Sequence, residues 1–260
     1  MKVVTVINQK GGVGKTTTVA AMGSTLMEMG YKTLLIDLDM QRNLSIYYNL
    51  SNEAELDGTA ENIFGGNVET KNILELIYET EQGDIVPASE NLAKVAEGTV
   101  NDSNRINKLK NALAGADQYY DYVIIDTPPS LGIITLNALT ASDYAIIPTE
   151  AGAFSMVGLV QVNKTIQAVQ KHSNDKLKVA GILITKFIKN TSANKHMKKT
   201  IEEIGTKLER PVFESTIRNT ITVAETQIYR KSLTEYAAYN DVTFDYKHFV
   251  EEFLEKTKEE

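Results

Sequence analysis

A glycine-rich loop between an apolar strand pattern and a helical pattern constrains the fold of this chain more than any other feature. It follows the apolar run 3–8 and precedes the helical stretch 16–29. Glycines let successive backbone N–H groups turn inward as an anion nest, and the N-terminus of the following helix adds partial positive charge. The spacing predicts a nucleotide site in which Lys15 reaches the β- and γ-phosphates and the Thr16 hydroxyl ligates Mg²⁺. The predicted nucleotide-binding loop comprises Lys10, Gly11, Gly12, Val13, Gly14, Lys15, Thr16 and Thr17.

The rest of the chain repeats this alternation of apolar strands and helices. A strand, a helix and a second strand in succession imply parallel strands joined by a right-handed crossover. We therefore predict an α/β fold, a doubly wound and mostly parallel sheet of about seven or eight strands flanked by helices. The expected strands are 3–8, 33–37, 122–126, 144–148 and 179–185, with weaker candidates at 84–87 and 211–213. The expected helices are 16–29, 131–141, 155–172, 192–208 and 240–256, while residues 45–83 give no clear pattern.

Composition narrows the class of protein further. The 260 residues are 42% hydrophobic and 23% charged, which allows one sizeable core without covalent staples. No linker divides the chain, so we expect a single domain over 1–260, with no separate N-terminal DNA-reading module. The absence of cysteine excludes disulfides, thiolate zinc sites, Cys-ligated iron–sulfur clusters and Cys nucleophiles. No apolar run of 18 residues exists, so we expect no membrane span and a cytoplasmic protein.

Three acidic residues follow apolar strands. Asp37 and Asp39 come at the end of the second strand, and Asp126 ends the run Tyr-Val-Ile-Ile-Asp. The carboxyl ends of parallel strands meet at one edge of a sheet, which is also where the glycine loop lies. An acid mounted on a rigid strand suits Mg²⁺ coordination, usually through water, and a second acid can orient the attacking water. We expect Thr16, Asp39 and Asp126 around the metal; one of the two acids after the second strand could instead be only a helix cap.

Lys10 has no place in the generic phosphate-loop pattern, and by itself it reads as a surface lysine. With it, the loop resembles the deviant Walker A motif of the ParA/MinD ATPases, and Asn8-Gln9 is similar to the ParA/Soj branch. The generic pattern has glycine where this chain has Gln9. The resemblance implies that Lys10 reaches across a dimer interface to the partner's nucleotide phosphates.

The resemblance extends over roughly residues 1–240 and assigns further roles. It implies that Asp39 polarises the hydrolytic water, so that Lys10, Lys15 and Asp39 form the catalytic set. At this acidic motif the chain has Met40 for the family's proline and Arg42 for its glycine, while both acids are retained. Segments similar to those that lie near the adenine in the family add Lys186, Arg218 and Asn219 to the nucleotide-binding residues. The metal acid Asp126 is counted with them, because it begins a segment similar to the family's second switch.

A basic stretch stands out in an acidic chain. The net charge is −7, yet residues 171–199 hold eight lysines against one aspartate, a local charge of +7. Such a stretch is either a solvated helix face or a set of contacts to nucleic-acid phosphates that do not depend on sequence. The candidate DNA-binding residues are Lys189, Lys195, Lys198, Lys199, Arg218 and Arg230.

The resemblance implies a ParA-type ATPase that partitions a plasmid or a chromosome region. In that family ATP joins two subunits into a sandwich dimer that binds double-stranded DNA without sequence preference. A ParB-like centromere-binding protein then stimulates hydrolysis and release. The implied cofactors are ATP and Mg²⁺, and the implied location is the cytoplasm, on the nucleoid.

Two alternatives remain open at the level of sequence. The first is a MinD-like ATPase that positions another cargo, although the tail 250–260 is acidic where a membrane-binding helix would be basic, so we expect no membrane partner. The second is a metabolic P-loop ligase of the dethiobiotin synthetase type. That ligase would consume ATP only with its substrate and leaves Lys10 without a role.

Overall fold

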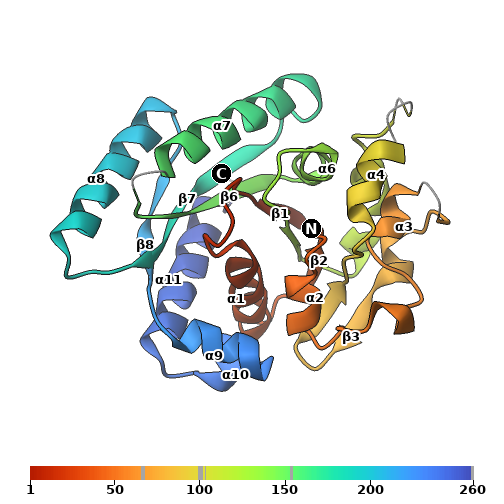
Figure 1. The fold of residues 1–260 in the computed structure, drawn as a ribbon, viewed down its shortest axis with the longest axis horizontal. Coiled ribbons are helices and arrows are strands. Elements are labelled where there is room, and N and C mark those ends of the chain that lie inside the picture. The colour runs from red at the N-terminus through yellow and green to blue at the C-terminus, as the bar shows by residue number, and fades with distance from the viewer. Residues whose placement is uncertain (66–67, 99–101, 103, 153–154, 259–260) are drawn as a thin grey trace.

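The eight described strands form one sheet (Figure 1). The structure is a computed structural model, and it describes residues 1–65, 68–98, 102, 104–152 and 155–258. The strand order is β3-β4-β2-β5-β1-β6-β7-β8, and every neighbouring pair is parallel except β3 with β4. The predicted doubly wound, mostly parallel sheet is thereby confirmed. The strands are β1 (Lys2–Val6), β2 (Thr33–Asp37), β3 (Tyr78–Thr80), β4 (Gly83–Val86), β5 (Tyr122–Asp126), β6 (Tyr144–Glu150), β7 (Lys178–Phe187) and β8 (Val212–Arg218).

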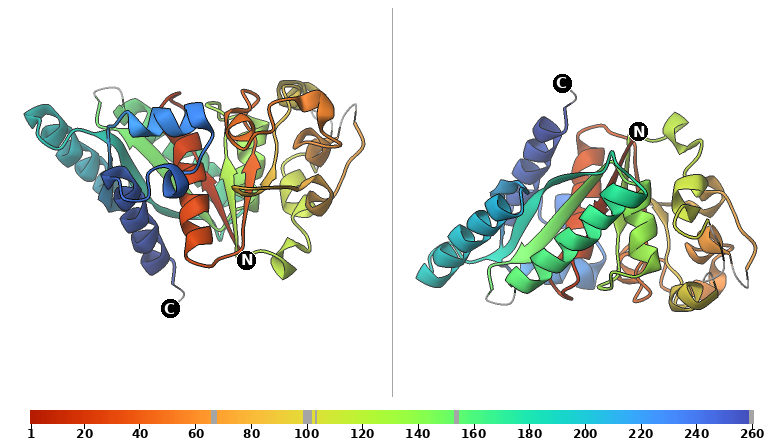
Figure 2. Two further views of the ribbon diagram at one scale, coloured as in Figure 1. Left: turned by 90° about the horizontal axis from the view of Figure 1, so that it is seen from below. Right: turned by 90° about the horizontal axis from the view of Figure 1, so that it is seen from above.

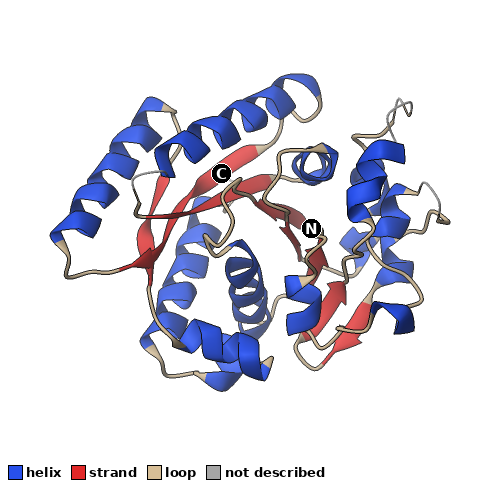
Figure 3. Ribbon diagram, in the orientation of Figure 1, coloured by secondary structure: helices blue, strands red, loops and turns tan. Residues whose placement is uncertain are grey.

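Helices cover both faces of the sheet (Figures 2 and 3). Apolar side chains of α1, α2, α10 and α11 pack on one face, and those of α3 to α8 pack on the other. No helix among the described residues is long and apolar enough to cross a membrane. The helices are α1 (Lys15–Glu28), α2 (Asn43–Tyr47), α3 (Glu61–Phe64), α4 (Leu92–Gly98), α5 (Lys108–Ala112), α6 (Ile133–Ala141), α7 (Ser155–His172), α8 (Ser192–Lys207), α9 (Thr222–Tyr229), α10 (Leu233–Tyr236) and α11 (Asp241–Lys256).

The central strands are apolar along their length because both of their faces are buried. In β1, Val4 and Val6 pack against the core under α1 and α11, while Val3 joins the core under α3 to α6. Alternate residues of a strand point to opposite faces, so a strand covered on both sides needs apolar residues at every position. This is why the sequence predicted these strands as unbroken apolar runs.

The topology brings the carboxyl ends of the central strands together next to β1. The chain leaves β1 for β2 on one side and later returns to β6 on the other side, so the strand order reverses next to β1. In open parallel sheets, ligands bind in the crevice at the carboxyl ends of the strands where the order reverses. Val6 and Asp37 both pair in register with Asp126, so the ends of β1, β2 and β5 lie side by side.

Candidate nucleotide-binding site

The glycine loop connects the end of β1 to the start of α1 and forms an open cradle. Gly12 and Gly14 have φ of 76° and 87°, a left-handed conformation that glycine adopts without strain. A β-carbon at Gly11 or Gly12 would meet no atom within 4 Å, so the space in front of the loop is free. The Thr185 hydroxyl of β7 donates a hydrogen bond of 2.8 Å to the Val13 carbonyl and anchors the loop. This arrangement, at the N-terminus of α1, suits an anion.

Lys15 and Asp126 place two buried charges beside the cradle. Lys15 is only 6% exposed, and its Nζ lies 3.5 Å from the Lys10 carbonyl oxygen. Burial lowers the pKa of Lys15, and the charges of Asp126 and Asp39 oppose that shift. Burial, and then the neighbouring Asp37, raises the pKa of Asp126 well above its usual range. Neither carboxylate oxygen of Asp126 has a hydrogen-bond partner among the described residues.

The structure distinguishes the two acids that follow β2. One carboxylate oxygen of Asp37 accepts hydrogen bonds from the backbone N–H and the hydroxyl of Ser45, at 2.8 and 2.7 Å, and the other accepts the N–H of Asp39 at 3.1 Å. Burial raises the pKa of Asp37 to about 6, although both hydrogen bonds from Ser45 act in the opposite direction. Asp39 lines the cavity instead. Asp37 therefore holds α2 in place, and Asp39 faces the site.

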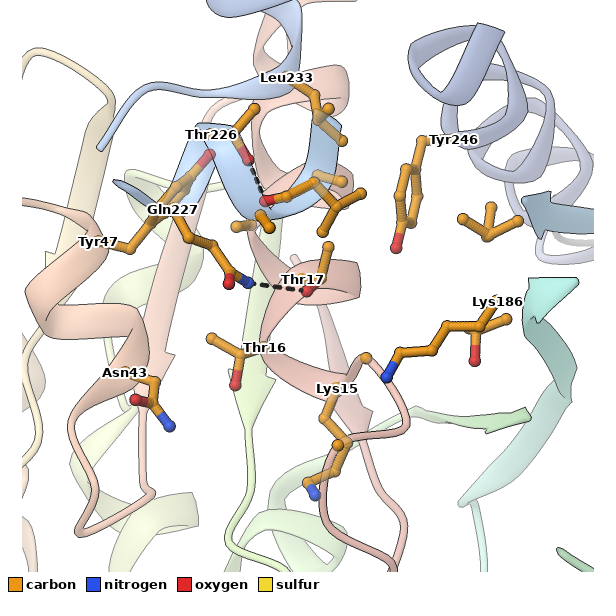
Figure 4. Close-up of a pocket in the computed structure, with 18 of the residues that line it drawn as sticks. Lys15, Thr16, Thr17, Asn43, Tyr47, Lys186, Thr226, Gln227, Leu233 and Tyr246 are labelled. Carbon is orange, nitrogen blue, oxygen red and sulfur yellow. Dashed lines mark hydrogen bonds between the residues drawn. The ribbon is translucent and has the colours of Figure 1, made fainter. Parts of the chain in front are cut away.

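A cavity of about 730 Å³ opens over the loop (Figure 4), within the range of small-molecule sites. Lys15 from the start of α1 and Lys186 from β7 both line it, and Gln227 of α9 donates a hydrogen bond of 3.3 Å to the Thr17 hydroxyl. Of the predicted residues, those that line the cavity are Gly11, Gly12, Gly14, Lys15, Thr16, Thr17, Asp39, Lys186, Arg218 and Asn219. Lining residues that sequence reasoning missed include Gln41, Asn43, Thr220, Gln227 and Tyr246. Of these, Gln41 lies between Met40 and Arg42 in the acidic motif, which was the signal that could have found it.

Lys10 lies at the rim of the cavity rather than in its lining. Its Nζ is 2.7 Å from Oε2 of Glu150 at the end of β6, and Nζ of Lys186 is 3.0 Å from Oε1 of the same carboxylate. The Lys10 side chain is 44% exposed. Burial alone would raise the pKa of Glu150, but hydrogen bonds and charge from the two lysines lower it. Glu150 thus bridges the two lysines.

The candidate DNA-binding residues separate into two groups. Lys189, Lys195, Lys198 and Lys199 gather in the first half of α8 and the loop before it; all are exposed except the half-buried Lys198, whose Nζ is 3.9 Å from Glu202.

Arg218 and Arg230 lie elsewhere. The Arg218 guanidinium pairs with Asp241 and with Asp245 of α11, its Nε lying 2.7 Å from Oδ2 of Asp245. Arg230 ends α9 and is half-buried, and its carbonyl accepts a hydrogen bond from Gln82. We keep the α8 group as the candidate DNA surface, because the charge of Arg218 is already compensated within the chain.

A strand, a glycine loop, a helix and an acid at the end of the neighbouring strand define the class of P-loop nucleotide-binding proteins. Residues 1–179 match the family described as AAA domain. The chain is 35% identical over 237 residues to the sporulation initiation inhibitor protein Soj of Bacillus subtilis, covering 90% of this chain and 91% of Soj. It is also 35% identical to the chromosome partitioning protein ParA of Myxococcus xanthus, covering 90% and 81%. The chain therefore belongs to the ParA/Soj family of P-loop partition ATPases.

The chain is also similar to a solved structure of a synthase. The cobyrinic acid a,c-diamide synthase of Mycobacterium smegmatis, solved with bound ADP and magnesium, superposes with a TM-score of 0.83. It is 31% identical, and the match covers 96% of this chain and 93% of the synthase. The likeness extends over nearly the whole fold.

Proposed function

We propose that this chain uses ATP to partition DNA, as a plasmid- or chromosome-segregation ATPase that acts as a dimer. The observation that carries the proposal is the opposite placement of two lysines in one loop. Lys15 is buried beside its own cavity, whereas Lys10 is exposed at the rim and outside the cavity lining. A lysine at the rim can reach the nucleotide of a second subunit that faces the site. The similarity to Soj and to ParA supports the same reading.

The residues of the site would share the work of ATP binding and hydrolysis. The loop N–H groups, the start of α1 and Lys15 bind the phosphates, while Lys186 and Asn219 form the wall toward the base. Asp39 orients the attacking water.

The donor set fits Mg²⁺, because both carboxylate oxygens of Asp126 are buried without a hydrogen-bond partner among the described residues, and Mg²⁺ is usually held by one or two carboxylates together with substrate phosphates. Thr16 and Asp126 would hold the ion together with the nucleotide. Bound there, Mg²⁺ would neutralise charge on the β- and γ-phosphates.

Two subunits joined by ATP would place two copies of the α8 lysines on one assembly. Lys189, Lys195, Lys198 and Lys199 supply the phosphate contacts, which carry no sequence information. A ParB-like centromere-binding protein would stimulate hydrolysis and release the ATPase from DNA. The protein would then act in the cytoplasm on the nucleoid, without a membrane partner, as one domain over residues 1–260.

The decisive experiment measures retention of duplex DNA with ATP, with ADP and without nucleotide, at 50 to 200 mM salt. If a dimer neutralises about six phosphates, its affinity should fall roughly a thousandfold over that range. Binding should need ATP and should be equal for unrelated sequences. A wild-type protein that ignores DNA in every nucleotide state but binds anionic vesicles would favour the MinD-like alternative.

The likeness to the diamide synthase favours a metabolic P-loop ligase as a second candidate. A ligase consumes ATP in proportion to a small substrate and needs no second molecule of this chain. A partition ATPase consumes ATP alone, and faster with DNA and a partner protein. ATP turnover by the purified chain, measured against protein concentration without any small substrate, separates the two: a ligase gives no turnover, and a dimeric ATPase gives a rate per subunit that rises with concentration.

A further inference from the structure

Arg42 adopts a backbone conformation that is unusual for a residue with a side chain. It immediately precedes α2, with φ of 56° and ψ of 25°, in the left-handed region. Glycine enters that region freely, whereas a β-carbon makes it unfavourable. Arg42 is also only 5% exposed. A strained residue persists where the surrounding structure holds it, so its contacts should show what holds it.

The guanidinium group of Arg42 donates to three backbone carbonyls. Nε lies 3.1 Å from the Ala88 oxygen, Nη1 lies 3.2 Å from the Ser51 oxygen, and Nη2 lies 2.9 Å from the Leu50 oxygen. The carboxylate of Glu53 lies 3.4 Å from Nε and compensates the buried charge. Two of these carbonyls follow α2 and the third follows β4. The side chain therefore ties the beginning of α2 to its end and to the neighbouring strand.

The backbone of Arg42 closes the turn that carries Asp39. Its N–H donates to the Asp39 carbonyl at 2.8 Å, and the N–H of Gln41 donates to the Asp39 carboxylate at 3.0 Å. Asp39 thus has its orientation set from within the turn 39–42. Because the backbone of Arg42 is part of this turn, the contacts that hold Arg42 also restrain the turn.

Asp37 holds the residues at both ends of this turn, because its carboxylate accepts the N–H of Asp39 at the start of the turn and the N–H and hydroxyl of Ser45 after it. The Ser45 hydroxyl that donates to Asp37 also accepts the N–H of Ala88 at 2.9 Å. Ala88 therefore bonds twice to residues 38–52, which we call the switch segment: to Ser45 through its N–H and to Arg42 through its carbonyl. Removing the guanidinium would leave one of these two attachments.

We infer that Arg42 is a positioning residue for hydrolysis, whose guanidinium keeps Asp39 facing the cavity before nucleotide binds. The inference rests on the proposed function, since it needs Asp39 to orient the attacking water. Without the guanidinium the turn samples other conformations, and only the fraction with Asp39 in place is competent. Lysine is a poor substitute, because one ammonium on a flexible stem does not reproduce the planar fork that serves three carbonyls.

Arg42→Gly tests this directly, because glycine keeps the observed φ accessible and removes only the side chain. In nucleotide-free protein, amide hydrogen exchange in residues 38–52 should become about tenfold faster, with no change in α1 or α11. The kcat for ATP should fall about tenfold, while the Kd for ATP stays within about twofold. Arg42→Lys should behave more like the glycine variant than like the wild type.

Arg210 offers a matched control far from the switch. It is a partly buried arginine between α8 and β8, bonded to the side-chain oxygens of Asn163 and Gln170 at 2.7 and 3.0 Å. Arg210→Lys should leave exchange in 38–52 and kcat as in the wild type. Were it to change both as strongly as Arg42→Gly does, the effect would be a general loss of rigidity and the inference would be overturned.

Other outcomes also decide. Unchanged amide exchange in residues 38–52 of Arg42→Gly would overturn the inference. So would faster exchange in that segment with a normal kcat, or faster exchange throughout the chain. If the wild type hydrolyses no ATP, the proposed function fails, and the exchange measurement alone still decides whether Arg42 holds the switch. If the glycine variant does not fold, Arg42→Lys, which keeps the buried charge, is measured in its place.

Discussion

Lys10 and Lys15 lie in the same loop, yet the molecule gives them opposite surroundings. Lys15 is 6% exposed beside two acids, and burial lowers its pKa. Lys10 is 44% exposed and pairs with Glu150, in an exposed contact of the kind that contributes only about 0–1 kcal/mol. The electrostatic surroundings of a buried charge such as Lys15 change strongly when a charged ligand enters the cavity beside it. An exposed pair can be exchanged at small cost for contact with another molecule.

The difference arises from how the chain leaves β1. Asn8 donates a hydrogen bond of 2.7 Å to the Pro148 carbonyl of β6 and accepts the N–H of Lys10 at 3.0 Å. It therefore turns the backbone of Lys10 toward β6, where Glu150 lies. Lys15 is the first residue of α1 and is buried. In the proposed function the inner part of the loop would therefore bind the subunit's own nucleotide, and the outer part would face a second subunit.

The inner lysine should give the largest effect. Lys15→Ala removes a buried positive charge from the phosphate cradle, and we expect ATP affinity to fall about a thousandfold. Calorimetric titration of the variant with ATP and Mg²⁺ measures this. Equal affinity in the variant and the wild type would remove Lys15 from the phosphate site.

The outer lysine should separate binding from turnover. Lys10→Ala should bind ATP as the wild type does, because its side chain lies outside the cavity lining. ATP-dependent dimerisation should be lost, and turnover should fall about a thousandfold, as for other cations supplied in trans to a phosphoryl group. Light scattering with ATP measures the dimer. If the variant dimerises and hydrolyses ATP normally, Lys10 is only a surface residue, and the proposed difference in role between Lys10 and Lys15 is wrong.

Asp39 lies outside the loop, after β2, and should affect the chemical step alone. Asp39→Ala should bind ATP and dimerise, because the carboxylate acts on water in the transition state. We expect kcat to fall about a hundredfold and a long-lived dimer to accumulate. Single-turnover hydrolysis with size-exclusion chromatography measures both. Normal turnover would transfer the role to Asp37 or to another group.

The fold was largely predictable because its central strands are buried on both faces and read as apolar runs. β3 was missed for the opposite reason: it is a three-residue edge strand with no buried residue, so its pattern carries no apolar signal. The helices α9 and α10 were also missed. Ile221 and Ile228 at the start and within α9 are 71% and 75% exposed, while the buried Thr226 is polar, which inverts the usual amphipathic pattern.

The loop was predictable from its contiguous motif, and the resemblance to a family added the distant Lys186, Arg218 and Asn219, but contacts between distant side chains were not predictable. The phosphate loop is one contiguous motif, so spacing alone specified it. Glu150 is 140 positions from Lys10 and meets it only because β6 lies next to β1. The contacts of Arg42 likewise depend on the packing of α2 against the end of β4. No local pattern encodes either arrangement.

The smallest expected effect concerns the lysines in the first half of α8, and it extends the comparison from one loop to the whole molecule. Lys195→Glu with Lys198→Glu should weaken ATP-dependent DNA binding about tenfold at moderate salt, equally for all sequences, and reduce its salt dependence.

Lys171→Glu with Lys207→Glu is the matched control, since it changes the net charge equally at the C-terminal ends of α7 and α8. Both double variants should bind ATP and dimerise normally, because all four lysines lie outside the nucleotide cavity. Filter retention of unrelated duplexes, with and without ATP, gives the two affinities. Equal weakening by both variants would mean that net charge alone attracts DNA, whereas unchanged binding in the first would place the contacts elsewhere, with Lys189 and Lys199 the next to test.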